Sequence, residues 1–155
     1  MTKKLVDLLI DKKLHISFAE SLTGGLCASK VISIPDASKV LGESYVTYSN
    51  EAKIKILGVK EETINKYSVV SSEVAYEMAR GLNNISKSDL CVSLTGLAGP
   101  LGDDIHEVGT VFIGLYYKNN IITKECHFGN IGRNNVREKA SDMAIKLAYE
   151  VINNA

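Results

Sequence analysis

The sequence predicts an α/β protein, a three-layer α/β/α sandwich around a mixed, mostly parallel five-stranded sheet. Five strand-like segments alternate with helical ones, and strands joined by helical crossovers build a sheet that is covered on both faces. The last two strand-like segments are separated only by Lys118-Asn-Asn, a hairpin-length connection that excludes a purely parallel sheet. The chain has 155 residues and no linker, repeat or low-complexity tract, so we expect one domain over residues 1–155.

In the first half of the chain, apolar residues at helical spacing predict helices, and alternating β-rich segments predict strands. Leu5, Leu8 and Leu9 lie on one face of the first helix, and Ile16 and Phe18 lie on one side of the first strand. In chain order we expect a helix over 3–13, a strand over 15–20, a helix over 26–34, a strand over 44–49 and a short helix over 50–57 that ends at Gly58.

In the second half, Ser71 or Ser72 is expected to cap a longer helix that carries Val74, Met78 and Leu82. Alternation then predicts strands over 89–95, 108–117 and 121–128, and a last helix over 135–152. Asn135 is the expected cap of that last helix, with Glu138 as its capping-box partner.

The charges of the chain balance, with 18 Lys and Arg against 18 Asp and Glu. No net field therefore attracts nucleic acid or an acidic membrane, and an anionic ligand needs a local site. Two lysines interrupt the first apolar run, and no run reaches the roughly 18 apolar residues of a membrane span. We expect a cytoplasmic protein with no nucleic-acid or membrane partner.

The cysteines and histidines give no sign of a metal or disulfide site. Three cysteines lie far apart in apolar surroundings, which predicts buried thiols in a reducing compartment, and no Cys or His spacing fits a metal. We therefore expect no cofactor. The cysteines are Cys27, Cys91 and Cys126.

Three loops follow the carboxyl ends of predicted strands, where open α/β sheets bind their ligands. The first loop, Glu20-Ser-Leu-Thr-Gly-Gly25, places Ser21 at the strand end and Gly24 and Gly25 at the start of a helix. Backbone N–H groups there can approach an anion or a developing oxyanion. The alternative is that Ser21 or Thr23 only caps the helix. The spacing fits neither a Walker A loop nor a Gly-x-Ser-x-Gly elbow.

The second loop, Tyr48-Ser-Asn-Glu-Ala-Lys53, places Lys53 in the first turns of a short helix that Ser49 can cap. If that lysine is partly buried, desolvation favours its neutral form, which can act as the general base for a serine hydroxyl. The alternative is an ordinary solvated lysine. No acidic residue is placed to orient a histidine, so a Ser-Lys pair is favoured by elimination over a Ser-His-Asp triad; the histidines are His15, His106 and His127.

The third loop, Thr95-Gly-Leu-Ala-Gly-Pro100, begins with the small residues Thr95 and Gly96, against which a ligand can pack closely; an ordinary glycine-rich turn is the alternative. Two of the three arginines, Arg133 and Arg137, flank the start of the last helix. Cations there oppose the helix dipole, so a bound phosphate is one explanation for them and solvent exposure is the other.

These motifs together resemble one protein family. Ala19-Glu-Ser-Leu-Thr-Gly-Gly25, Val46-Thr-Tyr-Ser-Asn-Glu-Ala-Lys53, Thr95-Gly-Leu-Ala-Gly-Pro100 and Val108-Gly-Thr-Val111 resemble the CinA C-terminal domain, in the same order and over nearly the whole chain. That family includes stand-alone bacterial nicotinamide mononucleotide amidohydrolases. The resemblance implies a three-layer α/β/α homo-oligomer that hydrolyses nicotinamide mononucleotide to nicotinate mononucleotide and ammonia without a metal.

The resemblance also assigns roles to individual residues. Ser21 would be the nucleophile and Lys53 its base. In the mechanism that we expect from these roles, backbone N–H groups of the turn after Ser21 hold the oxyanion. The remaining substrate-binding residues would be Tyr48, Thr95, Gly96, Arg137 and, by a looser match, Arg133, with Thr23, Gly24 and Gly25 forming the oxyanion turn.

The chain departs from the family pattern at two places. Leu22 stands where the family often has Cys, and Ile105-His-Glu107 replaces a common Lys-Pro pair, which leaves the substrate preference open. The second activity of longer members, carried by an N-terminal domain, is expected to be absent. Two alternatives share the same loops: a catalytically silent nucleotide-binding regulatory module, and a different amidase or phosphate-ester enzyme on this scaffold.

Overall fold

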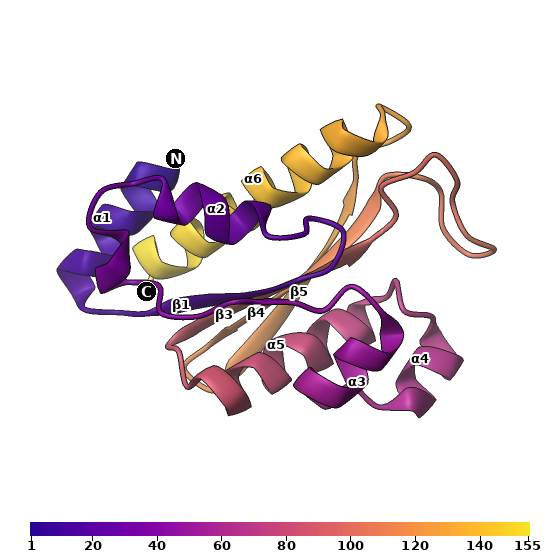
Figure 1. Ribbon diagram of the computed structural model, residues 1–155, viewed down its shortest axis with the longest axis horizontal. Helices are drawn as coiled ribbons and strands as arrows, with labels where there is room; N and C mark the ends of the chain where they lie inside the picture. The colour runs from indigo at the N-terminus through magenta and orange to yellow at the C-terminus, as the bar shows by residue number, and fades with distance from the viewer.

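A computed structural model describes residues 1–155 and contains one five-stranded sheet of strand order β2-β1-β3-β4-β5 (Figure 1). The first three strands in that order are parallel, and β4 and β5 are each antiparallel to the strand before them, so only β4 runs against the others. The mixed, mostly parallel sheet is therefore confirmed. The strands are β1 (Ile16–Glu20), β2 (Tyr45–Val46), β3 (Leu90–Gly96), β4 (Thr110–Tyr117) and β5 (Asn120–His127).

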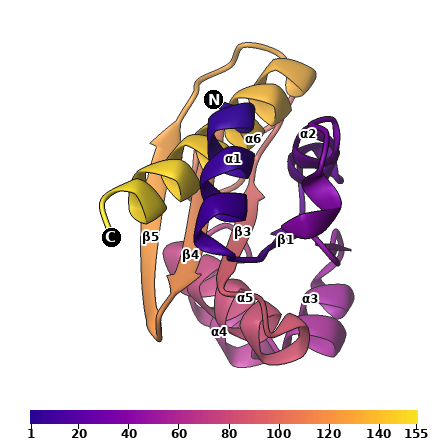
Figure 2. The same cartoon turned by 90° about the vertical axis from the view of Figure 1, so that its left-hand side faces the viewer.

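Helices cover both faces of the sheet, which gives the expected three layers (Figures 1 and 2). One layer contains α1 (Thr2–Lys12), α2 (Leu26–Ile32) and α6 (Arg133–Asn153). The other contains α3 (Asn50–Leu57), α4 (Glu61–Tyr67) and α5 (Ser72–Ser86). A short 3-10 turn, Ala37–Lys39, leads from α2 towards β2.

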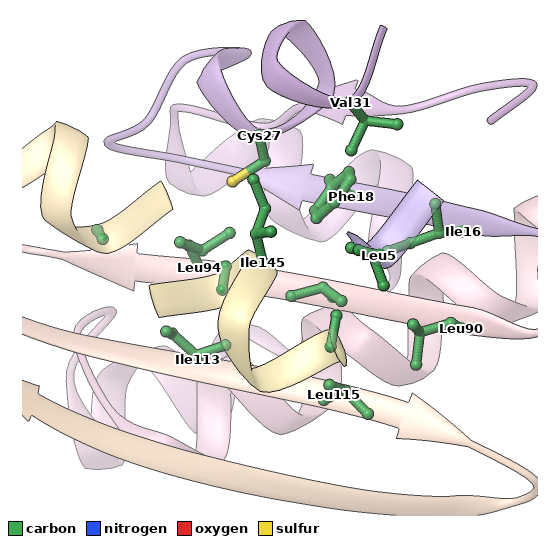
Figure 3. Close-up of a cluster of buried hydrophobic side chains, with 14 of the residues drawn as sticks. Leu5, Ile16, Phe18, Cys27, Val31, Leu90, Leu94, Ile113, Leu115 and Ile145 are labelled. Carbon is green, nitrogen blue, oxygen red and sulfur yellow. The ribbon is translucent and has the colours of Figure 1, made fainter. Parts of the chain in front are cut away.

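The core has two parts because alternate strand residues face opposite helix layers. Phe18 of β1 and Ile113 of β4 pack with Leu5 of α1 and Ile145 of α6 in the larger cluster (Figure 3). Ala19, the next residue of β1, faces the other way and joins Met78 of α5 in a smaller cluster. All five residues of β1 are buried, as expected of a strand that is covered on both faces.

The strand β2 is shorter than the predicted 44–49, because the chain leaves the sheet after Val46 to begin α3. Thr47 still donates its N–H to the carbonyl of Glu20, and Ser49 then caps α3 by accepting the N–H of Ala52 at 3.0 Å. Two elements, α4 and the 3-10 turn, were not predicted. No residue of α4 is buried, so its sequence carries no apolar periodicity.

The expected cap of the last helix is wrong. The α6 helix begins at Arg133 after Gly132, which has φ of 99°, and no side chain caps it. Asn135 lies within the first turn, where its amide donates to the carbonyl of Ile131 at 2.9 Å. Glu138 pairs with Lys30 of α2 at 2.8 Å instead of completing a capping box. The reason is the glycine-containing turn before the helix, which enters helical conformation two residues earlier than expected.

The β4–β5 hairpin and the buried thiols agree with the sequence. Only Lys118 and Asn119 separate the two strands, and both have the positive φ that two-residue hairpin loops require. All three cysteines are free and buried, and burial raises the pKa of each thiol. None of the helices combines the length and apolarity needed to cross a membrane.

Ser71, and not Ser72, caps α5. Its Oγ accepts the N–H of Val74 at 3.2 Å, whereas the Ser72 hydroxyl contacts only the neighbouring Glu73 carboxylate. We expect Ser71→Ala to lower the free energy of unfolding by about 0.5–2 kcal/mol, since a helix-end N–H loses its acceptor. Ser72→Ala is the matched control, with a change within about 0.5 kcal/mol. Urea denaturation measures both, and equal effects would contradict this assignment.

Candidate active site

A cavity of about 300 Å³ lies at the carboxyl ends of β1 and β3. The loop after β1, the start of α3, the loop after β3 and the start of α6 meet at this end of the sheet (Figure 1). The three sequence-predicted loops therefore converge. Six of the predicted site residues line the cavity: Ser21, Tyr48, Lys53, Thr95, Gly96 and Arg133.

Ser21 directly follows β1 and is only 8% exposed. The preceding Glu20 is fully buried, and its two carboxylate oxygens accept the N–H groups of Cys27 and Ala28 at 2.9 and 3.1 Å. These bonds hold the first turn of α2 against the end of β1, so the intervening turn is fixed at both ends. The sequence reasoning missed this role of Glu20, although an acidic residue near a helix start is the available signal.

Lys53 is buried on α3, with 1% exposure, and forms no ion pair. Its Nζ donates to Ser21 Oγ at 3.1 Å and to the carbonyls of Thr47 at 2.9 Å and Tyr48 at 3.0 Å, so the three N–H bonds of the ammonium form each have an acceptor. When the amine is neutral, its two N–H bonds can remain on the two carbonyls, and its lone pair can accept the Ser21 hydroxyl. Burial lowers the pKa of Lys53 from 10.5 to about 8, because desolvation disfavours the ammonium form.

The other polar residues of the cavity are held by main-chain groups. Thr95 donates its hydroxyl to the carbonyl of Val69 at 2.9 Å. A side chain on Gly96 would meet Val111 at 2.7 Å, which explains the glycine. Arg133 lies at the rim, where it donates to the Gly99 carbonyl and, at 3.1 Å, to the hydroxyl of Tyr48, whose side chain is exposed.

The charge of the cavity is one-sided. Lys53 and Arg133 are the basic side chains that line the cavity, and no Asp or Glu lines it. Several apolar residues that the sequence reasoning missed complete the wall, because nothing in a short apolar stretch marks it as part of a site; among them are Leu22, Val69, Val70 and Leu97. The cavity therefore suits a ligand with an apolar ring and an anionic group.

Four predicted residues do not line the cavity: Thr23, Gly24, Gly25 and Arg137. Gly24 uses its N–H to donate to the carbonyl of Ser21 at 3.1 Å, so that group is not available to an oxyanion. The N–H groups of Leu22 and Thr23, by contrast, have no acceptor within the protein. Arg137 turns its guanidinium onto the backbone of this turn.

The family model of the CinA C-terminal domain matches residues 1–152. The chain belongs to this family. It is 48% identical to a Clostridium kluyveri protein named as competence-damage inducible, over 94% of the chain and 35% of the relative. It is 44% identical to a CinA-like protein of Kosmotoga olearia, over 96% of the chain and 36% of the relative. The chain thus spans about a third of the length of these curated relatives.

Solved structures of the CinA superfamily share the fold. The superfamily protein KP700603 from Klebsiella pneumoniae matches with a TM-score of 0.95 at 28% identity, covering 99% of this chain and 96% of that one. The competence/damage inducible protein CihA from Agrobacterium tumefaciens matches with a TM-score of 0.90 at 34% identity, covering 98% and 95%.

The buried amine makes a stability prediction that does not depend on activity. The pKa of Lys53 is about 8 in the folded state against an ordinary 10.5, so between these values the unfolded chain holds the proton more tightly and stability rises with pH. Below pH 8 both states are protonated and the full penalty of burying the charge remains. We expect the free energy of unfolding of the unmodified protein to rise relative to Lys53→Met by about 2 kcal/mol from pH 7 to pH 9.5.

Urea denaturation at several pH values measures this difference. Lys55→Met, on the exposed side of the same helix, is the matched control and should show no such trend. A stability difference between Lys53→Met and the unmodified protein that does not change with pH would mean that the amine has an ordinary pKa.

Proposed function

We propose that this chain hydrolyses the carboxamide of nicotinamide mononucleotide, giving nicotinate mononucleotide and ammonia. The observation that carries the proposal is the 3.1 Å contact between Lys53 Nζ and Ser21 Oγ inside a cavity without acidic side chains. A serine hydroxyl bound to a desolvated amine is a nucleophile next to its base. The family resemblance supplies the substrate, because members of the family include such amidohydrolases.

The reaction would proceed through an acyl-enzyme. Neutral Lys53 takes the proton of Ser21 as Oγ attacks the carboxamide carbon, and the carbonyl oxygen becomes an oxyanion. Lys53 then gives the proton to the departing nitrogen, which leaves as ammonia. Water, deprotonated by the same amine, attacks the ester, and nicotinate mononucleotide leaves as the serine recovers its proton.

The oxyanion needs donors, and the N–H group of Leu22 is the best-placed candidate in this turn. Leu22 directly follows the nucleophile, lines the cavity and has no acceptor for its N–H in the protein, whereas Thr23, Gly24 and Gly25 do not line the cavity. One such donor is worth about 2.7–4 kcal/mol in enzymes that hydrolyse acyl groups.

The other residues of the cavity suit the pyridine ring and the phosphate of the substrate. Val70 and Leu97 offer apolar surface to the pyridine ring, and Arg133 at the rim offers a guanidinium to the phosphate. Tyr48 and Thr95 would orient the bound nucleotide. The resemblance alone supports one further part of the proposal, namely that the protein forms a homo-oligomer; the three free, buried cysteines support the proposal that it acts in the reducing cytoplasm.

The dyad predicts the effect of two substitutions. We expect Ser21→Ala and Lys53→Met each to lower ammonia release from nicotinamide mononucleotide by at least about 10³-fold, because each removes one half of the nucleophile–base pair. Ser29→Ala and Lys55→Met, at exposed positions of α2 and α3, are matched controls that should retain activity. An enzyme-coupled ammonia assay measures all four.

Two results would contradict this function. Near-normal turnover by both dyad variants would exclude the mechanism. Binding of the nucleotide without any ammonia release by the unmodified protein would instead support the catalytically silent nucleotide-binding module.

The low pKa of Lys53 also predicts the pH dependence of kcat/KM. Only the neutral amine can accept the serine proton, so activity should rise with pH and level off above about 8. At pH 6 we expect kcat/KM to be roughly 100-fold below its plateau, as each pH unit below the pKa removes about nine-tenths of the neutral form. A flat profile between pH 6 and 9 would show that Lys53 is not the base.

A further inference from the structure

The guanidinium of Arg137 is occupied by the turn that follows Ser21. Its Nε donates to the carbonyl of Leu22 at 2.8 Å, and one Nη donates to the carbonyl of Thr23 at 3.4 Å. The other Nη donates to Asn134 Oδ1 at 3.0 Å, within α6. Each of its three nitrogens therefore has a protein acceptor, and the residue does not line the cavity.

These contacts fix the orientation of two peptide groups. A peptide is planar and trans, so its C=O and N–H point in opposite directions. Holding the Leu22 carbonyl on Arg137 therefore turns the N–H of Thr23 away from Arg137. Thr23 is fully buried and does not line the cavity, so this contact supplies no donor of its own; it fixes the turn that carries Ser21 and Leu22, which do line the cavity.

The turn also leaves space for the guanidinium. Gly24 has φ of 58°, and a side chain there would lie 3.3 Å from an Nη of Arg137. The carbonyl of Thr23 accepts a second N–H, that of Leu26 at 3.0 Å, which ties the same peptide to the start of α2. The arginine thus packs over a turn whose shape depends on it.

We infer that Arg137 is a positioning residue, which holds the Ser21 turn and the free N–H group of Leu22 in the geometry needed for acyl transfer. The inference deepens the proposed function and rests on it for the reaction. The phosphate of the substrate then falls to Arg133, which lines the cavity. The two arginines of α6 have different tasks.

The chain supplies a matched control in Lys30. Its Nζ joins α2 to α6 through Glu138 and Asp142, both at 2.8 Å, and through Ser141 at 2.6 Å. It makes no contact with the carbonyls of the Ser21 turn. Lys30→Ala therefore removes a cation from the same pair of helices without touching that turn.

The experiment compares nicotinamide mononucleotide with nicotinamide riboside, which lacks the phosphate, in the variants Arg133→Ala, Arg137→Ala, Arg137→Lys and Lys30→Ala. We expect Arg137→Ala to lower kcat roughly 100-fold for both substrates, with KM changed less than about threefold, because a misplaced catalytic geometry costs about that much. Arg137→Lys should rescue little, since one nitrogen cannot serve both carbonyls.

The other two variants should separate the roles. Arg133→Ala should raise KM for the mononucleotide roughly 10- to 100-fold more than it raises KM for the riboside, as expected for the loss of a charged hydrogen bond to phosphate. Lys30→Ala should keep kcat within about threefold. Three results would overturn the inference: a loss in Arg137→Ala confined to the mononucleotide, no loss with either substrate, or an equal loss in Lys30→Ala.

A second readout does not require the proposed substrate. A fluorophosphonate labels an activated serine when Ser21 Oγ forms a bond to phosphorus, fluoride leaves and Lys53 takes the serine proton. We expect Arg137→Ala to slow labelling of Ser21 roughly 100-fold, and Lys30→Ala to leave it unchanged. If the unmodified protein does not hydrolyse the nucleotide but labels much faster than Arg137→Ala, the proposed function fails and the inference stands. Labelling at the same rate in both proteins overturns the inference.

Discussion

The structure of the site depends on an amine that is buried without a counter-ion. Lys53 is 1% exposed and has no carboxylate partner, so its ammonium form is disfavoured and its Nζ relies on hydrogen bonds to neutral acceptors. The carbonyls of Thr47 and Tyr48 supply two of these, and they can do so because the chain has left the sheet after Val46. The short second strand leaves both carbonyls turned towards the amine, and Ser49, which caps α3, fixes the point where the helix begins.

The α6 helix aligns the two halves of the site. Its apolar residues, among them Val136 and Ile145, pack in the larger core cluster, which fixes the helix relative to the sheet. Its first two turns then carry one arginine to the cavity rim and another to the turn after Ser21. Both arginines project from one helix, so α6 contacts both the cavity rim and the turn that follows Ser21. Lys30 adds a connection from α2 to the next turn of the same helix.

The sequence predicts most of the fold because apolar periodicity reports burial directly. The strands β1 and β3 and the helices α1 and α3 lie within two residues of their predicted bounds, and α5 begins directly after one of its two predicted caps, because each of these elements has buried residues in the core. The α4 helix escapes prediction because it has no buried face. The start of α6 was misplaced because the turn before it is set by glycine conformation at Gly132, and capping preferences alone pointed to Asn135.

The candidate site could be predicted only in part. Residue types and strand ends indicated which loops would meet, but the pairing of Ser21 with Lys53 came from elimination and from the family resemblance, because chain spacing does not determine distance. The sequence could not predict the direction in which individual backbone N–H and C=O groups point. Gly24 and Gly25 looked like oxyanion donors, yet the turn uses the N–H of Gly24 internally. Arg137 was likewise expected to bind the substrate phosphate. The sequence places this residue near the start of a helix, but it does not show which acceptors the guanidinium contacts.

The departure at Ile105-His-Glu107 can be interpreted in the same physical terms. Asp103 accepts the N–H groups of Ile105 and His106 at 2.9 and 2.6 Å, and the His106 ring packs edge-on against Phe112 at 5.4 Å between centroids. These contacts organise the loop locally without the Lys-Pro pair that the family often has there. None of the three substituted residues lines the cavity, whereas Leu101 of the same loop does, with 80% of its surface exposed. A change in substrate preference would therefore reach the bound nucleotide through the position of Leu101 at the rim, and not through direct contact with the substituted residues.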